Sequence, residues 1–151
     1  MLAHDRQAGF TLIETLMVIA LIALLAAVLA PSMIPTPNNQ LRANAAELIS
    51  ALRAARLHAM RSREAAALQI DTEQKTYQPP GGTSSKALNG DFNIQLTTVQ
   101  SELTDGSRGD IRFFPDGSST GGRITLSNGN LTQHVDVAWL TGRVRLLKDR
   151  P

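Results

Sequence analysis

One apolar segment near the amino terminus limits what this chain can fold into more than any other feature. Residues 10–30 carry only three polar side chains, those of Thr11, Glu14 and Thr15. An α-helix rises about 1.5 Å per residue, so a helix of this length matches the roughly 30 Å hydrocarbon core of a bilayer. We therefore predict a transmembrane helix over residues 10–30.

The residues before this segment do not form an ordinary secretory signal. Such a signal places small residues at a cleavage site after its apolar run, whereas Gly9 comes before the run. Cleavage after Gly9 removes only residues 1–9 and leaves the apolar helix on the mature protein.

Glu14 is the unusual residue of the apolar segment. A carboxylate inside an apolar span costs about 2.5–3.5 kcal/mol on insertion scales unless it is paired. Two interpretations stay open. Either Glu14 remains hydrated near the membrane surface, or it pairs with a cation at membrane depth, and the α-amino group that cleavage creates on Phe10 of a second subunit is the obvious cation.

The ordered motif at residues 9–14, Gly9-Phe10-Thr11-Leu12-Ile13-Glu14, followed directly by an apolar helix, resembles the N-terminal signature of type IV pilins and of the pseudopilins of type II secretion. The resemblance implies that a prepilin peptidase cuts between Gly9 and Phe10 and that the new terminus at Phe10 is N-methylated. It further implies that Glu14 neutralises a neighbour's terminal amine during assembly and that Pro31 bends the helix.

The same resemblance implies a location and a set of partners. We expect a single-pass protein of the inner membrane, with its N-terminus in the cytoplasm and its C-terminal domain in the periplasm. The expected partners are the prepilin peptidase and other pseudopilins, which the chain contacts through its N-terminal helix.

The remainder of the chain is long enough for one modest globular domain. The chain has 151 residues, of which 42% are hydrophobic and 19% are charged. It contains no cysteine, so it has neither a disulfide framework nor a thiolate metal site.

Three prolines follow the apolar segment, and residues 31–40 are predicted to break the helix. Each of Pro31, Pro35 and Pro37 removes a backbone donor and disfavours helical backbone at the preceding residue. Asn38 or Asn39 is then expected to cap a new helix.

An amphipathic helix is predicted over residues 41–67, where apolar residues recur at spacings of three and four. This stripe consists of Leu41, Ala45, Leu48, Ile49, Leu52, Ala59, Met60, Ala66 and Ala67. Five arginines fall mostly off the stripe and are interpreted as a solvated face: Arg42, Arg53, Arg56, Arg61 and Arg63.

Beyond residue 67 the apolar period changes to two, which predicts short strands separated by turns that contain glycine. The alternating positions are Leu68 and Ile70, Phe92, Ile94 and Leu96, Ile111 and Phe113, Ile124 and Leu126, Val135, Val137 and Trp139, and Val144 and Leu146. We expect an α+β fold in which the amphipathic helix covers one face of an antiparallel sheet formed by about six strands within the periplasmic β domain, residues 68–151. Residues 78–89 are rich in proline, glycine and serine, and are predicted to form a mobile loop.

Charge is distributed unevenly along this domain. Residues 67–122 carry four basic and seven acidic side chains, whereas residues 123–151 carry five basic and two acidic ones. Arg143 and Arg145 lie two apart on a predicted strand, so their side chains point to the same side. They form a candidate contact surface for a partner or for DNA.

The chain has little that resembles a catalytic centre. Residues 117–121 match the pattern G-x-S-x-G, but a nucleophile elbow needs a helix after the serine and a strand is predicted there. His58 and His134 are the imidazoles left once the leader is removed. The acids Asp105, Asp110 and Asp116 do not have a calcium-loop spacing. We therefore predict no enzymatic activity, no metal and no cofactor.

A second resemblance involves the C-terminal half. Residues 114–122, with Thr141-Gly142-Arg143-Val144, resemble the C-terminal domain of the H-type minor pseudopilins and of the related T-type minor pilins. The implied function is that of a minor pseudopilin, which supports export of folded proteins from the periplasm across the outer membrane. The alternative is a minor type IV pilin that binds DNA during uptake through Arg143 and Arg145.

Overall fold

The computed structural model describes residues 11–29, 36–99, 103–105 and 107–148. The chain divides into two compact units, Met1–Pro35 and Thr36–Pro151. The predicted processing residues Gly9 and Phe10 and the predicted helix bend at Pro31 lie outside the described residues.

The first unit contains helix α1, Leu12–Leu29. Thr11 precedes the helix, and its Oγ1 accepts a hydrogen bond from the backbone N–H of Glu14 at 3.3 Å. A threonine three residues before a glutamate is the capping-box spacing, so the motif also starts the helix. The large apolar side chains of α1 between Leu12 and Leu25 are exposed, from 49% at Val18 to 81% at Leu12. Among the described residues, no helix has both the length and the apolar character needed to span a membrane.

The second unit begins with helix α2, Pro37–Ser62. Thr36 is its N-cap, and its Oγ1 accepts a hydrogen bond from the backbone N–H of Asn39 at 3.4 Å. The helix ends because Arg63 takes a left-handed conformation with φ 59°. Its buried residues recur at spacings of three and four and are Leu41, Asn44, Ala45, Leu48, Leu52, Ala55 and Ala59.

The bounds of α2 differ from the predicted 41–67 at both ends. Pro37 is the first helical residue, where its missing N–H costs nothing and its restricted φ suits a helix. The predicted break over residues 31–40 thus includes the start of α2, and the cap is Thr36 rather than an asparagine. At the other end, Ala66 and Ala67 belong to a strand.

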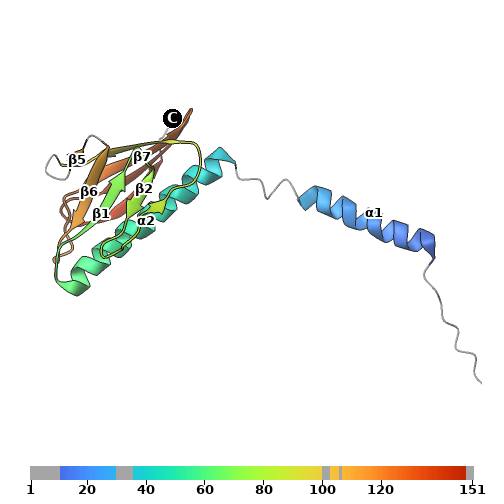
Figure 1. Cartoon of the computed structure of the whole chain (residues 1–151), viewed down its shortest axis with the longest axis horizontal. Helices are drawn as coiled ribbons and strands as arrows, with labels where there is room; N and C mark the ends of the chain where they lie inside the picture. Colours follow the sequence, from blue (N-terminus) through green and yellow to red (C-terminus); the bar gives the residue numbers. More distant parts are fainter. Residues whose placement is uncertain (1–10, 30–35, 100–102, 106, 149–151) are drawn as a thin grey trace, which may run out of the picture. The chain divides into compact units, whose positions relative to one another are not determined.

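In the part of the chain that the structure describes, nine strands form two antiparallel sheets, which Figure 1 shows beside α2. The first sheet has the order β3-β2-β1-β6-β5 and consists of β1 Ala66–Asp71, β2 Thr76–Gln78, β3 Lys86–Ala87, β5 Leu103–Asp105 and β6 Arg108–Phe113. The second has the order β4-β7-β8-β9 and consists of β4 Asn93–Thr97, β7 Gly122–Asn128, β8 Leu131–Val137 and β9 Val144–Lys148. The predicted α+β class and antiparallel pairing are confirmed.

Three strands and the division into two sheets were not predicted. In the segment expected to be a mobile loop, Lys86 pairs with Tyr77, and Leu88 is buried to 5% exposure. A buried leucine holds this segment on the domain, because leaving the loop would expose its side chain to water. Trp139, expected on a strand, lies in the turn after β8 and is 68% exposed.

One hydrophobic core lies between α2 and the two sheets. Its members come from every layer: Leu41, Ala45, Leu48, Leu52, Ala55, Ala59, Ala66, Leu68, Ile70, Tyr77, Leu88, Phe92, Ile94, Ile111, Phe113, Ile124, Leu126, Val135, Val137 and Val144. Alanines at the second half of α2 let the sheets approach closely there. The same half of α2 positions the loops described next.

Candidate functional site

Two loops meet at the end of the second unit where α2 finishes. Residues 114–121 connect β6 to β7, and residues 138–143 connect β8 to β9. The backbone N–H of Ser119 donates to the carbonyl oxygen of Trp139 at 2.8 Å, which joins the loops directly. A Cβ on Gly121 would lie 3.0 Å from the Cβ of Trp139, so glycine lets the two loops approach this closely.

The second loop is a tight turn with its own hydrogen bonds. Gly142 N–H donates to the carbonyl of Ala138 at 2.7 Å, and Ala138 N–H donates to the carbonyl of Arg143 at 3.0 Å. Two large apolar side chains project from it into solvent, Trp139 at 68% and Leu140 at 66% exposure. The turn therefore presents apolar groups on a hydrogen-bonded backbone.

Arg56 of α2 lies between the two loops. Its Nε donates to the carbonyl oxygen of Gly117 at 3.0 Å. A Cβ on Gly142 would lie 2.3 Å from that same oxygen and 2.8 Å from Arg56 Nε, and a Cβ on Gly117 would lie 2.8 Å from an Arg56 terminal nitrogen. We call Arg56 and the loops 114–121 and 138–143 the Arg56 junction.

The two arginines of the predicted contact surface lie beside this junction, in different settings. Arg143 is the last residue of the turn, whereas Arg145 is on β9; both are exposed. Arg145 pairs across the ladder with Asp136, which pairs in turn with Arg123. Arg123 Nε and Nη2 bind the Asp136 carboxylate at 2.6 and 2.9 Å. The negative charge of Asp136 therefore partly neutralises the cross-strand row of Arg123, Asp136 and Arg145. Arg143 was predicted to lie on a strand, but it lies in the turn before β9.

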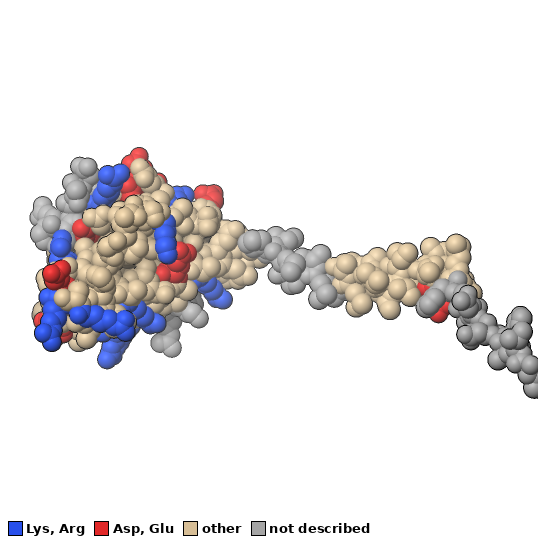
Figure 2. All heavy atoms as spheres, turned by 60° about the horizontal axis from the view of Figure 1, so that its bottom comes forward, with Lys and Arg blue, Asp and Glu red and all other residues tan. Residues whose placement is uncertain are grey.

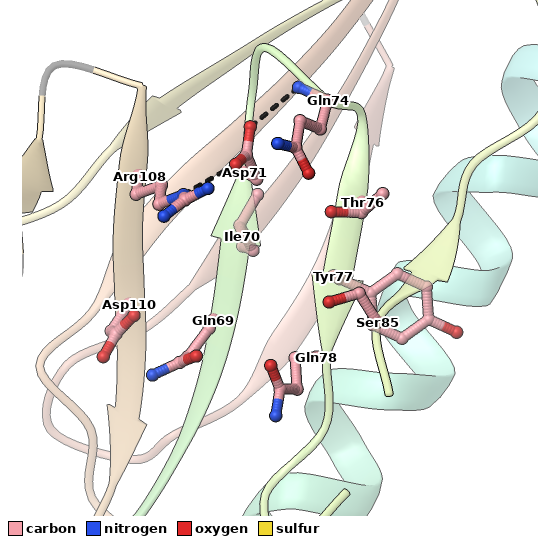
Figure 3. A pocket seen from close by; sticks show the side chains of 10 residues that line it. All are labelled: Gln69, Ile70, Asp71, Gln74, Thr76, Tyr77, Gln78, Ser85, Arg108 and Asp110. Atoms are coloured by element: carbon pink, nitrogen blue, oxygen red, sulfur yellow. Dashed lines mark hydrogen bonds and ion pairs between the residues drawn. The ribbon is translucent and has the colours of Figure 1, made fainter. Parts of the chain in front are cut away.

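A separate polar hollow of about 330 Å³ lies on the first sheet, and Figure 3 shows its lining side chains. Its charged pair is Asp71 and Arg108, joined at 2.7 Å. The backbone N–H of Gln74, followed by Arg108, lowers the pKa of Asp71 from its usual value. Because Asp71 also accepts from the N–H of Glu73 at 3.0 Å, its carboxylate closes the β1–β2 turn. This role is structural.

Tyr77 connects this sheet to α2. Its hydroxyl donates to Glu47 Oε1 at 2.7 Å. Burial, with the hydrogen bond and negative charge of Glu47, raises the pKa of Tyr77 to about 12. The bond ties β2 to the middle of α2.

The serines and histidines that the structure describes do not converge on a reaction centre. Ser119, the serine of the G-x-S-x-G pattern, is buried and its hydroxyl oxygen accepts from Gly121 N–H at 2.9 Å. Strand β7 follows, as predicted. His134 lies on β8 with its Nδ1 2.9 Å from Thr125 Oγ1, and His58 lies on α2.

Of the predicted assembly residues, the structure describes Glu14 alone, in the exposed first turn of α1. The junction was missed because Arg56 was interpreted as part of a solvated helix face. Its only sequence signal is indirect: Arg56 lies between Ala55 and Ala59, small buried residues that leave room for loops beside the helix.

Two known families match separate parts of the chain. Residues 44–141, more than half of the chain, match the family Type II transport protein GspH. Residues 4–30 match the prokaryotic N-terminal methylation motif. These ranges include the N-terminal motif and loop 114–121, on which the predicted resemblance rests, and the prediction is confirmed.

A curated relative and two solved structures agree with these matches. The chain is 36% identical over 139 residues, 91% of its length and 81% of the relative's, to type II secretion system protein H of Xanthomonas campestris pv. campestris. Its fold is similar to the type IV minor pilin FimU of Pseudomonas aeruginosa, with a TM-score of 0.56, 16% identity and coverage of 72% of this chain and 89% of that one. It is also similar to the minor pseudopilin EpsH of the Vibrio cholerae type 2 secretion system, with a TM-score of 0.55, 14% identity and coverage of 72% and 97%.

The two solved structures show a pilin-like fold and do not separate a pilin from a pseudopilin, since both are below 25% identity. The separation comes from the sequence matches, which extend over most of the chain and agree with each other. On the family match over residues 44–141 and the 36% identical relative, this chain belongs to the GspH family of type II transport proteins.

Proposed function

We propose that this chain is a minor pseudopilin of a type II secretion filament and that it supports export of folded proteins from the periplasm across the outer membrane. The observation that carries the proposal is the 36% identity to a type II secretion system protein H over 91% of the chain. The GspH family match over residues 44–141 supports it independently of the N-terminal motif.

The N-terminus is processed before assembly in this proposal. A prepilin peptidase cuts between Gly9 and Phe10, and Phe10 becomes N-methylated, in keeping with the methylation-motif match over residues 4–30. The protein is then a single-pass protein of the inner membrane, with the Thr36–Pro151 unit in the periplasm. Pro31 provides the bend after the apolar helix.

The N-terminal helix drives assembly with other pseudopilins. Apart from Glu14, the large side chains of α1 between Leu12 and Leu25 are apolar and exposed, and a helix with this character requires lipid or other helices around it. In the filament, Glu14 pairs with the terminal amine of a neighbour's Phe10, because a carboxylate among apolar helices is costly without a cation. The function is structural and uses no catalysis, metal or cofactor.

DNA uptake is the competing function, and the charges around Arg145 weigh against it. DNA binding depends on several cations that each neutralise a phosphate. Arg145 lies opposite Asp136, whose carboxylate already binds Arg123. Because Asp136 lies between Arg123 and Arg145, its negative charge reduces the attraction of this surface for a phosphate backbone.

The proposal is tested by deleting the gene in the native host and measuring a secreted protein in the medium and in the periplasm. We expect periplasmic accumulation that the wild-type chain reverses and that Glu14→Ala reverses poorly although it still inserts in the membrane. Normal secretion in the deletion strain together with a loss of DNA uptake would replace this proposal by the competing function.

A further inference from the structure

Exposed apolar side chains lie on the segments around the Arg56 junction. Within the described part of that unit, eight large apolar side chains are exposed, and five of them belong to α2's second half, to the segment after β4 or to the turn after β8. These five are Leu57, Met60, Val99, Trp139 and Leu140. Large exposed apolar patches that are rimmed by polar residues mark interaction sites.

Three arginines line a hollow of about 420 Å³ beside this apolar group. Arg53 and Arg56 come from α2 and Arg143 from the turn, and the remaining lining residues are Thr141, Gly142 and Val144. Among the residues that the structure describes, no carboxylate lines it. Three like charges at one hollow repel one another and attract an anion.

Part of this hollow is organised before any ligand arrives. Arg56 Nε is bound to the carbonyl of Gly117 at 3.0 Å, which orients its guanidinium group beside Gly142. The turn that carries Arg143 is closed by the hydrogen bond between Arg143 and Ala138. Preorganised groups lose little freedom on binding and so contribute more to affinity.

The surface around the hollow, at the C-terminal end of α2, is basic as well. Its exposed arginines include Arg61 and Arg63, against Glu64 and Asp116 as acids. Figure 2, in which the lower side of Figure 1 is turned forward, shows blue side chains along the lower margin of this unit and both blue and red side chains along its left margin. Arg61 lies in the last turn of α2, where its positive charge interacts favourably with the negative end of the helix dipole. We therefore do not assign it to the hollow.

We infer that this end of the domain is a docking surface for an acidic patch on the folded domain of another pseudopilin. A carboxylate of the partner enters the Arg53, Arg56 and Arg143 hollow, and apolar partner side chains cover Trp139 and Leu140. Tryptophan and arginine are the residues that most often dominate protein interfaces. The inference rests on the proposed function, because it takes its partner from the same filament.

A protein surface fits these residues better than a nucleic acid does. The apolar group includes the aliphatic Leu57, Val99 and Leu140, which stack poorly on bases and gain most from contact with other apolar side chains. Guanidinium groups bind carboxylates through paired hydrogen bonds. The combination of guanidinium groups and exposed apolar side chains therefore favours a partner carboxylate that is surrounded by apolar side chains.

Cysteine crosslinking in the native host tests the inference, since the chain has no cysteine of its own and one introduced thiol is unique. Leu140→Cys probes the proposed surface. Leu131→Cys, at an exposed leucine that begins β8, is the matched control, and Met17→Cys in α1 reports assembly through the helix. The full-length chain is treated in membranes with a thiol-to-amine crosslinker, and adducts are identified by mass spectrometry.

We expect Leu140→Cys to give adducts with another pseudopilin at a yield about tenfold or more above Leu131→Cys, consistent with a hot-spot contact. Adding Arg143→Glu should lower the Leu140→Cys yield by about tenfold, whereas Arg42→Glu, a change at an exposed arginine near the start of α2, should leave it unchanged. The Met17→Cys yield should be the same in both charge variants.

Several results would overturn the inference. Pseudopilin adducts at Met17→Cys without any at Leu140→Cys would refute this surface and leave the proposed function standing, whereas their absence at both positions would refute both. Adducts at Leu140→Cys that join only two copies of this chain would assign the surface to self-association. Retention of the full-length chain on duplex DNA at physiological salt, lost in Arg143→Glu, would assign it to nucleic acid.

Discussion

Replacing Gly142 by alanine is the sharpest test of the Arg56 junction. Gly142 has φ +59°, a conformation that residues with a Cβ rarely adopt. The added methyl group would lie 2.3 Å from the carbonyl oxygen of Gly117 and 2.8 Å from Arg56 Nε. Since the first of these atoms is backbone, the two loops must separate to admit the methyl group.

The cost follows from three contributions. The left-handed backbone costs about 1 kcal/mol, overpacking about 1–3 kcal/mol, and loss of the hydrogen bond from Arg56 to Gly117 about 1 kcal/mol. The sum, roughly 3–5 kcal/mol, is a large share of the 5–15 kcal/mol that usually holds a domain folded. We expect Gly142→Ala to lower the free energy of unfolding of the Thr36–Pro151 unit by this amount, measured by urea denaturation.

Gly129→Ala is the matched control. Gly129 has φ +56°, nearly the same as Gly142, but an added Cβ there meets no atom within 4 Å. It should therefore cost only the backbone contribution, about 1 kcal/mol. Equal losses for the two variants would refute the claim that the loops and Arg56 are packed against Gly142.

Three further predictions concern other parts of the chain. Tyr77, whose pKa is raised to about 12, stabilises the fold below pH 10 and loses that contribution as pH rises from about 10 through 12. Tyr77→Phe should lower the free energy of unfolding by about 1 kcal/mol at pH 7 and should reduce the loss of stability at alkaline pH, measured by urea unfolding across pH. Asp71, whose pKa is lowered, stabilises the fold at pH values above about 4 and loses this contribution as pH falls. Asp71→Asn should lower the free energy of unfolding by about 1–2 kcal/mol at pH 7 and should show less destabilisation by acid in the same assay. An unchanged dependence of stability on acid pH would count against the turn-closing role. Intact mass of protein from a host with a prepilin peptidase should lack residues 1–9, and a mass that retains them would contradict the proposed processing.

The strands that the sequence predicted well are those that bury one face. Ile124 and Leu126 on β7 and Val135 and Val137 on β8 alternate with polar residues, and all four are buried. A period of two identifies such strands because successive side chains point to opposite faces of the sheet and only one face is buried. The Asn128-Gly129 turn between them was predicted for the same local reason and closes that hairpin.

The strands that were missed depend on their neighbours instead. β3 has two residues, Lys86 and Ala87, both exposed, and it exists only because β2 offers a free edge beside it. The separation into two sheets likewise depends on how β6 and β7 diverge at loop 114–121. Neither feature leaves a pattern within a short window of sequence.

The glycines of the two β-turns show most clearly where local reasoning ends. Asn128-Gly129 and Thr141-Gly142 are both a polar residue followed by glycine, and both glycines have φ near +60°. They differ in what lies opposite, open solvent for Gly129 and the carbonyl of Gly117 with Arg56 for Gly142. Arg56 and Gly117 are 61 residues apart in the chain, so this contact exists only once α2, β6 and β8 have packed together. An arginine that helix periodicity assigns to solvent thus becomes the residue that joins two loops, because the helix has a second set of neighbours that its own sequence does not encode.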